Sequence, residues 1–486
     1  MTGMLPTLAV LLAVAATAVA QGRPSEFTGQ DVGEVTAGPG APSADGGAWP
    51  QFRGARRDAT VPAAEAQGLL RQWPAGGPKV LWSIDGLYMG YSGPAVHGGR
   101  VFFHDYDDEG RGLTPPGPRW MVRCVSLADG REIWRWSYRR QIRVNHAVTR
   151  TVPATDGTHV ISFDPKAVLH GLDAATGRRL WAIDLPAQYG ARIPPWYNGQ
   201  CPLLDEGRAI IGVGGRQTLM IAVDPATGKV LWEAPNGAGH ALSHSSVVPA
   251  VIGGRRQYVW CTLTGIVGVA ADDGSILWEA LWRPGGGGAA AVQAYAARSP
   301  HATIVDWQTN TAVAPSPVVL EDGRIFMTAG YKAGAAMFAV QGGPDGRFAV
   351  KLDYTLAHDQ FNSDCQTPIV HDGRLYSVDF SVPPPVPSDP KGYFACVAPG
   401  DGAVLWRHRG QTFGLGNWLL VGDVLFAMDG DTGTLHMIEA SPEGYRPLGS
   451  ATVVGGHEAW APLAYVNGKL LCRGLGRMVC LEVGRP

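Results

Sequence analysis

The chain has few cysteines, and none of them forms a familiar redox or metal-binding motif. Its 486 residues include seven Cys, without a C-x-x-C pair for zinc or a C-x-x-C-H motif for haem. An odd number leaves at least one thiol without a partner in the chain. Cys124 and Cys396 precede two similar tryptophans by the same ten positions. We therefore expect the cysteines to act as small buried apolar side chains.

A strong net charge and the signatures of several enzyme classes are also missing. The formal net charge is −2, whereas a protein that binds nucleic acid through its phosphates needs a basic surface. Nucleic acid is therefore not an expected partner. The chain has no G-x-S-x-G motif, and no Gly-Lys-Ser/Thr follows the glycines at 285–288, which argues against a serine hydrolase and a P-loop.

The one apolar run that fits a targeting segment lies at the N-terminus. Residues 1–20 are mostly Leu, Ala and Val and end in Ala18-Val19-Ala20, as in a signal peptide with its cleavage site. The run is too short to favour a membrane-spanning helix, although no Lys or Arg precedes it. We predict export to the periplasm or medium, with no transmembrane segment after cleavage. An uncleaved anchor and a mis-assigned start are the alternatives.

Composition then changes along the chain. Residues 21–46 are rich in Gly, Pro, Ser and Ala, which predicts a disordered linker. Residues 47–486 carry the repeated motifs described next, and we predict that they form a single domain.

A repeated motif is the most abundant signal in the sequence: glycine, three residues, tryptophan. Its period of about 40–50 residues is typical of propellers and solenoids. Each glycine follows an Asp-containing turn between two apolar runs, which predicts a β-hairpin. The large tryptophan on the outgoing strand would then wedge against the neighbouring blade. Full copies end at Trp134, Trp181, Trp232, Trp278 and Trp406, and weaker copies at Val350 and Leu448.

A second motif alternates with the first and predicts the innermost strands. It consists of a proline, an apolar run and a glycine-containing turn, and proline suits the first position of a strand. Its eight copies begin at Pro94, Pro153, Pro202, Pro249, Pro317, Pro368, Asn417 and Pro462.

Eight opening motifs but only seven closing positions indicate how the ring closes. The missing outer strand lies at the other end of the chain, in Lys79–Trp82. We therefore predict an all-β fold: one eight-bladed β-propeller of four-stranded antiparallel blades, closed by an N-terminal strand that joins the C-terminal blade. Closure of this kind removes exposed sheet edges. Trp82 thus joins the predicted docking tryptophans.

The residues just before the inner strands should gather around one mouth of the central channel. Polar and aromatic side chains recur there, which indicates a ligand pocket; the alternative is a set of solvated loop residues that bond to the backbone. The candidates are His146, Trp196, Tyr197, Asn198, His240, His244, His358, Asn362, Asp364, Trp418, His457 and Glu458.

The sequence also allows three kinds of chemical site: a metal pair, a general-base cluster and calcium-binding acidic turns. His240 and His244 have metal-ligand spacing for a helix, but their Gly and Ser neighbours indicate a loop. His358, Asp359 and Asp364 resemble a general-base cluster without an identifiable nucleophile. The acidic turns at 105–109 and 429–431 are compatible with calcium but also with ordinary turns. We predict no catalytic residue and no metal site, and a flap over the mouth or a linker at 285–314.

The motif at 173–181, Asp-Ala-Ala-Thr-Gly-Arg-Arg-Leu-Trp, and the segment Trp49-Pro-Gln-Phe-Arg-Gly54 resemble the tryptophan-docking propellers of the pyrroloquinoline quinone (PQQ) type. The resemblance covers about residues 49–483. That family includes quinoprotein alcohol dehydrogenases, which hold PQQ and calcium on the axis, and the outer-membrane assembly scaffold BamB, which holds no cofactor. The repeat implies the fold and leaves the activity open.

The chain lacks what the resemblance demands of an enzyme. Methanol-dehydrogenase-like members carry a disulfide between adjacent cysteines over the cofactor, and no two cysteines are adjacent here. We therefore expect an exported, monomeric, non-catalytic propeller without a cofactor, which acts as a binding or scaffold module for protein or glycan partners of the cell envelope. The alternative is a PQQ-dependent alcohol dehydrogenase-like oxidoreductase with PQQ and calcium.

Overall fold

The computed structural model describes residues 31–66, 68–108, 118–282, 289–309, 312–343, 346–382 and 391–485. The predicted signal peptide at 1–20 and the first part of the predicted linker lie outside these residues. No helix among the described residues is long and apolar enough to cross a membrane.

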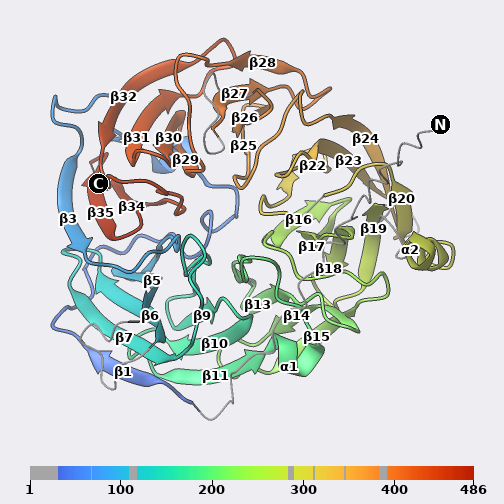
Figure 1. The fold of residues 1–486 in the computed structure, drawn as a ribbon, viewed down its shortest axis with the longest axis horizontal. Coiled ribbons are helices and arrows are strands. Elements are labelled where there is room, and N and C mark those ends of the chain that lie inside the picture. Colours follow the sequence, from blue (N-terminus) through green and yellow to red (C-terminus); the bar gives the residue numbers. More distant parts are fainter. Residues whose placement is uncertain are drawn as a thin grey trace, which may run out of the picture.

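Eight small sheets stand around a common axis, so the predicted eight-bladed propeller is confirmed (Figure 1). We number the blades in chain order from their inner strands. Blades 1 to 4 consist of β4 (Ala95–His97), β5 (Arg100–Asp107), β6 (Arg119–Ser126) and β7 (Glu132–Arg139); β8 (Ala154–Thr155), β9 (His159–Phe163), β10 (Val168–Asp173) and β11 (Arg179–Asp184); β12 (Leu203–Asp205), β13 (Arg208–Gly212), β14 (Thr218–Val223) and β15 (Val230–Pro235); β16 (Val248–Ile252), β17 (Arg255–Cys261), β18 (Gly265–Ala270) and β19 (Ile276–Trp282).

Blades 5 to 8 complete the ring. They consist of β21 (Val318–Val319), β22 (Arg324–Ala329), β23 (Gly334–Gly342) and β24 (Phe348–Leu356); β25 (Ile369–His371), β26 (Arg374–Asp379), β27 (Tyr393–Val397) and β28 (Val404–Arg407); β29 (Trp418–Val421), β30 (Val424–Asp429), β31 (Thr434–Glu439) and β32 (Arg446–Thr452); β33 (Ala464–Val466), β34 (Lys469–Arg473), β35 (Arg477–Glu482) and β3 (Lys79–Asp85). Two short helices, α1 (Leu185–Tyr189) and α2 (Ala289–Ala296), and a 3-10 turn at Ala63–Glu65 lie between strands.

The ring closes as predicted, with β3 from the N-terminal part paired antiparallel to β35 from the C-terminal end (Figure 1). Val80 lies opposite Leu481, and Trp82 lies opposite Cys480. This blade therefore joins residues about 400 positions apart and leaves the ring without an open edge at the seam.

Five outer tryptophans dock on the next blade through a hydrogen bond, and four of them also cover a glycine. Trp82 Nε1 donates to the carbonyl of Leu127 at 2.9 Å, and its ring covers Gly130, which has a φ of 71°. A Cβ on Gly130 would lie 2.7 Å from the ring. Both this close approach and the positive φ therefore require glycine. The same bond is made by Trp134 to Ala174, Trp181 to Pro225, Trp232 to Ala271 and Trp406 to Ser441.

Three blades depart from this arrangement, because blade 7 has Leu448 in place of the tryptophan and blades 4 and 5 use other contacts. Trp278, predicted as a docking residue, instead donates to Gln257 Oε1 of its own blade at 2.6 Å. In blade 5 the sequence assigned the docking position to Val350, but Tyr354 occupies it and donates to the Pro399 carbonyl at 3.0 Å. Beside Trp278, β20 (Ala302–Val305) adds in parallel to the outer edge of β19.

Three blades gain a fifth strand, which the prediction of four-stranded blades did not include. The stretch predicted as a flap or linker at 285–314 contributes α2 and β20, and these lie at the outer rim rather than over the mouth (Figure 1). β1 (Glu34–Ala37) pairs with the outer strand β7, so this part of the predicted disordered linker is ordered. The third addition is β2 (Thr60–Val61) on the inner strand β29.

The segment Trp49–Val61, here called the axial segment, runs inside the ring of inner strands. Trp49 pairs with Val96 of blade 1, and the Pro50 carbonyl accepts from Thr155 N of blade 2 at 2.8 Å. At its other end, β2 lies on blade 7. The segment thus crosses from one side of the channel to the other.

Two buried arginines fix the axial segment in this position. Arg53 donates from Nη1 to the Thr367 carbonyl and from Nη2 to the Pro368 carbonyl, both at 3.0 Å, next to blade 6. Arg57 donates to the carbonyls of Cys201 and Pro202, next to blade 3. Burial lowers the pKa of each guanidinium to about 10. The axial segment therefore connects blades on opposite sides of the ring.

Candidate functional site

The loops that lead from one blade into the inner strand of the next form the candidate site, here called the loop mouth. On one side, Tyr91 stacks on Trp460 with ring centroids 4.8 Å apart. The Tyr91 hydroxyl donates to Glu458 Oε2 at 2.7 Å, and His146 Nδ1 lies 2.9 Å from Glu458 Oε1. These residues come from blades 8, 1 and 2, which the ring brings together.

Arg150 connects this cluster to a second one. Its guanidinium lies 5.5 Å from the centroid of the Tyr91 ring, and its Nε donates to the Trp196 carbonyl at 2.7 Å. Trp196 stacks almost parallel on Tyr331, with 5.6 Å between centroids and 7° between planes. His244 packs beside Trp196 at 6.4 Å. Polar and aromatic side chains from several blades thus face one another across the loop mouth.

Burial and charge set the protonation of these groups. Burial lowers the pKa of His244 to about 4, and the nearby Arg150 adds to the effect. Burial alone would raise the pKa of Glu458, but the hydrogen bonds from Tyr91 and His146 outweigh it and place that pKa below its ordinary value. Burial also raises the pKa of Asp364. Glu458 is therefore an anion at neutral pH.

The backbone of the loop mouth carries conformational strain. Residues other than glycine rarely adopt a φ between +20° and +160°. Such strain collects at binding and catalytic sites, where surrounding contacts maintain it. At the loop mouth it occurs at His146 (57°), Trp196 (60°), Tyr197 (74°), Tyr331 (59°) and Glu458 (56°).

The sequence-predicted candidates separate into two groups. His146, Trp196, His244, Asp364 and Glu458 belong to the loop mouth. The others have different surroundings: the Tyr197 backbone is at the loop mouth but its side chain packs on a small apolar cluster, Asn198 and Asn362 are buried and bonded to backbone, Trp418 lies in the core, and His358 and His457 are exposed.

His240 shows that candidates close together in the sequence can face different parts of the fold. Its ring is fully buried, with Nδ1 2.7 Å from Thr262 Oγ1 and Nε2 3.1 Å from Glu279 Oε1. It therefore points into blade 4, while His244 faces the loop mouth. Because these two histidines diverge, they do not form the metal pair that their spacing allows.

The loop mouth also contains residues that the sequence analysis did not select. Tyr91, Arg150 and Trp460 each precede an opening proline by two or three positions, so the same positional rule could have found them. Tyr331 lies in the turn between β22 and β23, a different kind of loop that the rule does not reach.

Metal ligation finds no support among the described residues. No group of three or more His, Cys, Asp or Glu side chains in those parts of the chain is placed to hold an ion. Asp105 and Asp107, predicted in an acidic turn, lie instead in strand β5, where Asp105 Oδ2 is 3.1 Å from Arg123. Asp429 Oδ1 of the other acidic segment accepts from Gly414 N. Glu109 lies outside the described residues. All seven cysteines are free thiols.

Comparison with known proteins places the chain in a family. The family described as outer membrane protein assembly factor BamB matches residues 119–408. The chain belongs to this BamB family. BamB from Moraxella catarrhalis is a structural relative with 14% identity and a TM-score of 0.53, covering 83% of this chain and 99% of that one.

Quinoprotein dehydrogenases share the fold with this BamB-family chain. The quinohemoprotein alcohol dehydrogenase of Comamonas testosteroni is 14% identical with a TM-score of 0.57, covering 90% of this chain and 81% of that one. The 1-butanol dehydrogenase (cytochrome c) of Thauera butanivorans is 29% identical over 143 residues, which is 28% of this chain and 18% of the relative. The chain thus matches less than a fifth of that relative's length.

The residues of the loop mouth do not fit PQQ and calcium. PQQ is a flat tricarboxylate, and a ring inserted between two aromatic faces needs about 3.5 Å on each side. The Trp196 and Tyr331 centroids are only 5.6 Å apart. Arg150, the cation of this cluster, is bonded to the carbonyls of Trp196 and Asn145, and Glu458 is bonded to Tyr91 and His146.

One prediction concerns acid stability, because the propeller buries neutral histidines. Burial lowers the pKa of His104 to about 3. Below about pH 6.5 His104 is protonated in the unfolded chain but stays neutral in the folded protein. The free energy of unfolding therefore falls as the pH decreases toward 3. At pH 5 this single group costs about 2 kcal/mol. Urea unfolding at pH 7 and pH 5 should show a smaller difference for His104→Asn than for the parent.

The matched control for the acid test is His358→Asn, since His358 is exposed. This variant should keep the full difference in unfolding free energy between pH 7 and pH 5. Equal differences for the parent and His104→Asn would contradict the assignment.

Proposed function

We propose that the chain is an exported, non-catalytic β-propeller that acts as a binding scaffold for protein partners in the cell envelope. The observation that carries the proposal is the mutual pairing of the loop-mouth groups. Glu458, His146 and Tyr91 bond to one another, and Arg150 bonds to backbone carbonyls. Residues that already satisfy one another form a shaped, rigid surface, and these four side chains are engaged with one another or with backbone rather than free to act on a substrate.

Membership in the BamB family supports the same proposal. The family description names an assembly factor of outer membrane proteins, which implies protein partners and a periplasmic location. The apolar run and the A-x-A sequence at residues 1–20 support export independently. The alternative is the quinoprotein alcohol dehydrogenase activity named for two of the relatives.

A reconstitution assay distinguishes the scaffold function from the dehydrogenase activity. Purified full-length protein is incubated with PQQ and calcium, separated from free PQQ, and assayed for dye-linked oxidation of 1-butanol. We expect no stoichiometric PQQ uptake and no turnover, because the aromatic stack has no room and the basic group is already bonded. A known quinoprotein alcohol dehydrogenase, treated in parallel, verifies the reconstitution. Stoichiometric uptake together with turnover would overturn the proposal.

A further inference from the structure

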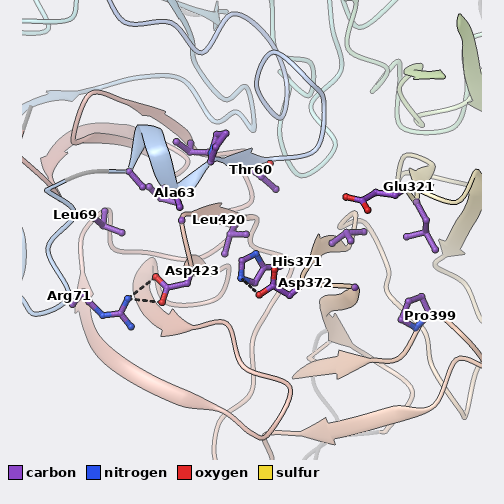
Figure 2. A pocket seen from close by; sticks show the side chains of 18 of the residues that line it. Thr60, Ala63, Leu69, Arg71, Glu321, His371, Asp372, Pro399, Leu420 and Asp423 are labelled. Atoms are coloured by element: carbon purple, nitrogen blue, oxygen red, sulfur yellow. Dashed lines mark hydrogen bonds and ion pairs between the residues drawn. The ribbon is translucent and has the colours of Figure 1, made fainter.

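A large groove lies at the opposite end of the ring from the loop mouth, where short turns join the first and second strands of the blades. Figure 2 shows it between the chain that follows the axial segment and the turns of blades 5, 6 and 7. We call it the turn-end groove. It is lined by Thr60–Ala63 and Leu69, by Leu420–Asp423 next to them, and by Leu320–Asp322 and Val370–Gly373 of blades 5 and 6. Its volume is about 1110 Å³, slightly above the usual range for small-molecule sites and therefore suited to a peptide.

One edge of this groove already shows how an inner strand binds an extended segment. β2 lies parallel to β29, with Leu420 N donating to the Ala59 carbonyl and Gly422 N to the Val61 carbonyl, both at 2.9 Å. The inner edge of blade 7 therefore accepts a further strand through backbone bonds alone, as in β-strand addition.

The neighbouring blade 6 offers the same edge without a strand on it. In β25, His371 pairs with Arg374 across the turn, and Val370 pairs with Leu375. Hydrogen-bonded and non-bonded pairs alternate in an antiparallel ladder, so the N–H and C=O of Val370 point away from β26, as those of Leu420 do in blade 7. Val370 lines the turn-end groove. Among the described residues, no backbone group outside the blade bonds to it.

The charges around this edge favour a basic partner. Asp423 is held by Arg71 at 2.7 Å and Asp322 by Arg324 at 2.8 Å. Glu321 has no cationic partner among the described residues, and Asp372 is 89% exposed, with only His371 nearby at 3.6 Å. Glu321 and the turn of Asp372 lie on either side of the space between blades 5 and 6 (Figure 2). The groove is also lined by the half-buried apolar side chains of Val370 and Leu320.

We infer that the turn-end groove binds an extended segment of a partner protein in which basic and apolar residues alternate, and that this segment adds as a strand to the inner edge of β25. Successive side chains of a strand point to opposite sides, so its apolar side chains cover the groove floor while its basic side chains reach Glu321 and Asp372. The inference rests on the proposed scaffold function and names the class of partner.

The probe is a short fluorescein-labelled synthetic peptide of alternating Val and Lys, titrated with the full chain at low salt and followed by fluorescence anisotropy. We expect saturable binding that weakens as salt is added, because exposed charges are screened. The double variant Glu321→Lys/Asp372→Lys should weaken binding by at least about tenfold, since like charges then oppose the peptide. Asp359→Lys, an equally exposed charge reversal on a different loop, should bind within about twofold of the parent.

A second peptide tests the backbone bonds. The same sequence with every backbone nitrogen methylated keeps its charge but has no backbone N–H on either edge to donate to β25, and it should bind at least about tenfold more weakly. No binding to the parent, equal binding by the double variant, or equal binding by the methylated peptide would each overturn the inference. Sedimentation of the parent must also show a monomer, because self-association lost in the double variant would assign the groove to a second copy of the chain.

The outcome is independent of the cofactor test. PQQ uptake with turnover would overturn the proposed scaffold function even if the peptide binds. Absence of both PQQ uptake and peptide binding would leave the scaffold function standing and remove this groove as its partner site.

Discussion

Replacing Trp82 with alanine is expected to lower the free energy of unfolding by about 3–5 kcal/mol, the range for truncating a large buried aromatic side chain. Trp82 is 6% exposed and donates to the Leu127 carbonyl. It also lies on β3, the strand that joins both ends of the chain in one blade. The variant therefore leaves a cavity and an unpaired carbonyl at the seam of the ring. Urea unfolding followed by tryptophan fluorescence and circular dichroism measures the loss.

A double-mutant cycle with Gly130 distinguishes docking from general packing. Gly130→Ala alone should be strongly destabilising, because its Cβ would lie 2.7 Å from the Trp82 ring and its φ is 71°. In the Trp82→Ala background the ring is gone, and only the cost of the positive φ remains. We expect the two changes to couple by about 0.5–3 kcal/mol. Strict additivity, or an unchanged melting temperature for Trp82→Ala, would contradict the docking geometry.

The repeats predicted the fold because each copy encodes its own local structure. In the turn at 173–177, Asp173 Oδ1 accepts from the backbone of Ala175 and Thr176, and Gly177 takes a φ of 74°. The middle strands are buried on both faces; every residue of β14 and β18 is buried. Local turn chemistry and burial were thus both visible in the sequence, and the count of motifs placed the seam.

The axial segment could not be predicted in the same way. It has no repeat, and its course depends on contacts with blades that lie hundreds of residues away. Arg53 and Arg57 both have a positive φ near 60°, and no local sequence pattern predicts this conformation for arginine. Two charged side chains in an Arg-rich stretch are ordinarily expected in solvent. Here tertiary hydrogen bonds outweigh that preference.

The loop mouth was predicted by position but only partly by residue. A propeller brings the residues before each inner strand to one end, where the structure pairs His146 with Glu458 and stacks Trp196 on Tyr331. Whether a side chain faces the axis or its own blade is decided by a shift of one or two residues. The His240 ring bonds to Thr262 and Glu279 inside blade 4, whereas His244 packs beside Trp196 at the loop mouth. Partners on distant strands are invisible to a positional rule.

Replacing Arg53 with methionine should also lower the free energy of unfolding by about 3–5 kcal/mol. The Arg53 side chain is 6% exposed and donates to four carbonyls: those of Arg57, Thr367, Asp58 and Pro368. Methionine keeps much of the apolar stem but leaves these buried acceptors without a donor, at about 1–3 kcal/mol for each one that water cannot reach. The axial segment would lose its connection to blade 6, and urea unfolding measures the resulting change.

Arg56 supplies the matched control, because it is the same residue type in the same segment with its side chain 54% exposed. Arg56→Met should change stability by no more than about 0.5 kcal/mol. Limited trypsin digestion gives a second measurement: cleavage after Arg57 should accelerate in Arg53→Met, since the segment opens locally before the ring unfolds. Equal unfolding midpoints and equal cleavage rates for the two variants would mean that the carbonyls of blade 6 do not hold the axial segment in the channel.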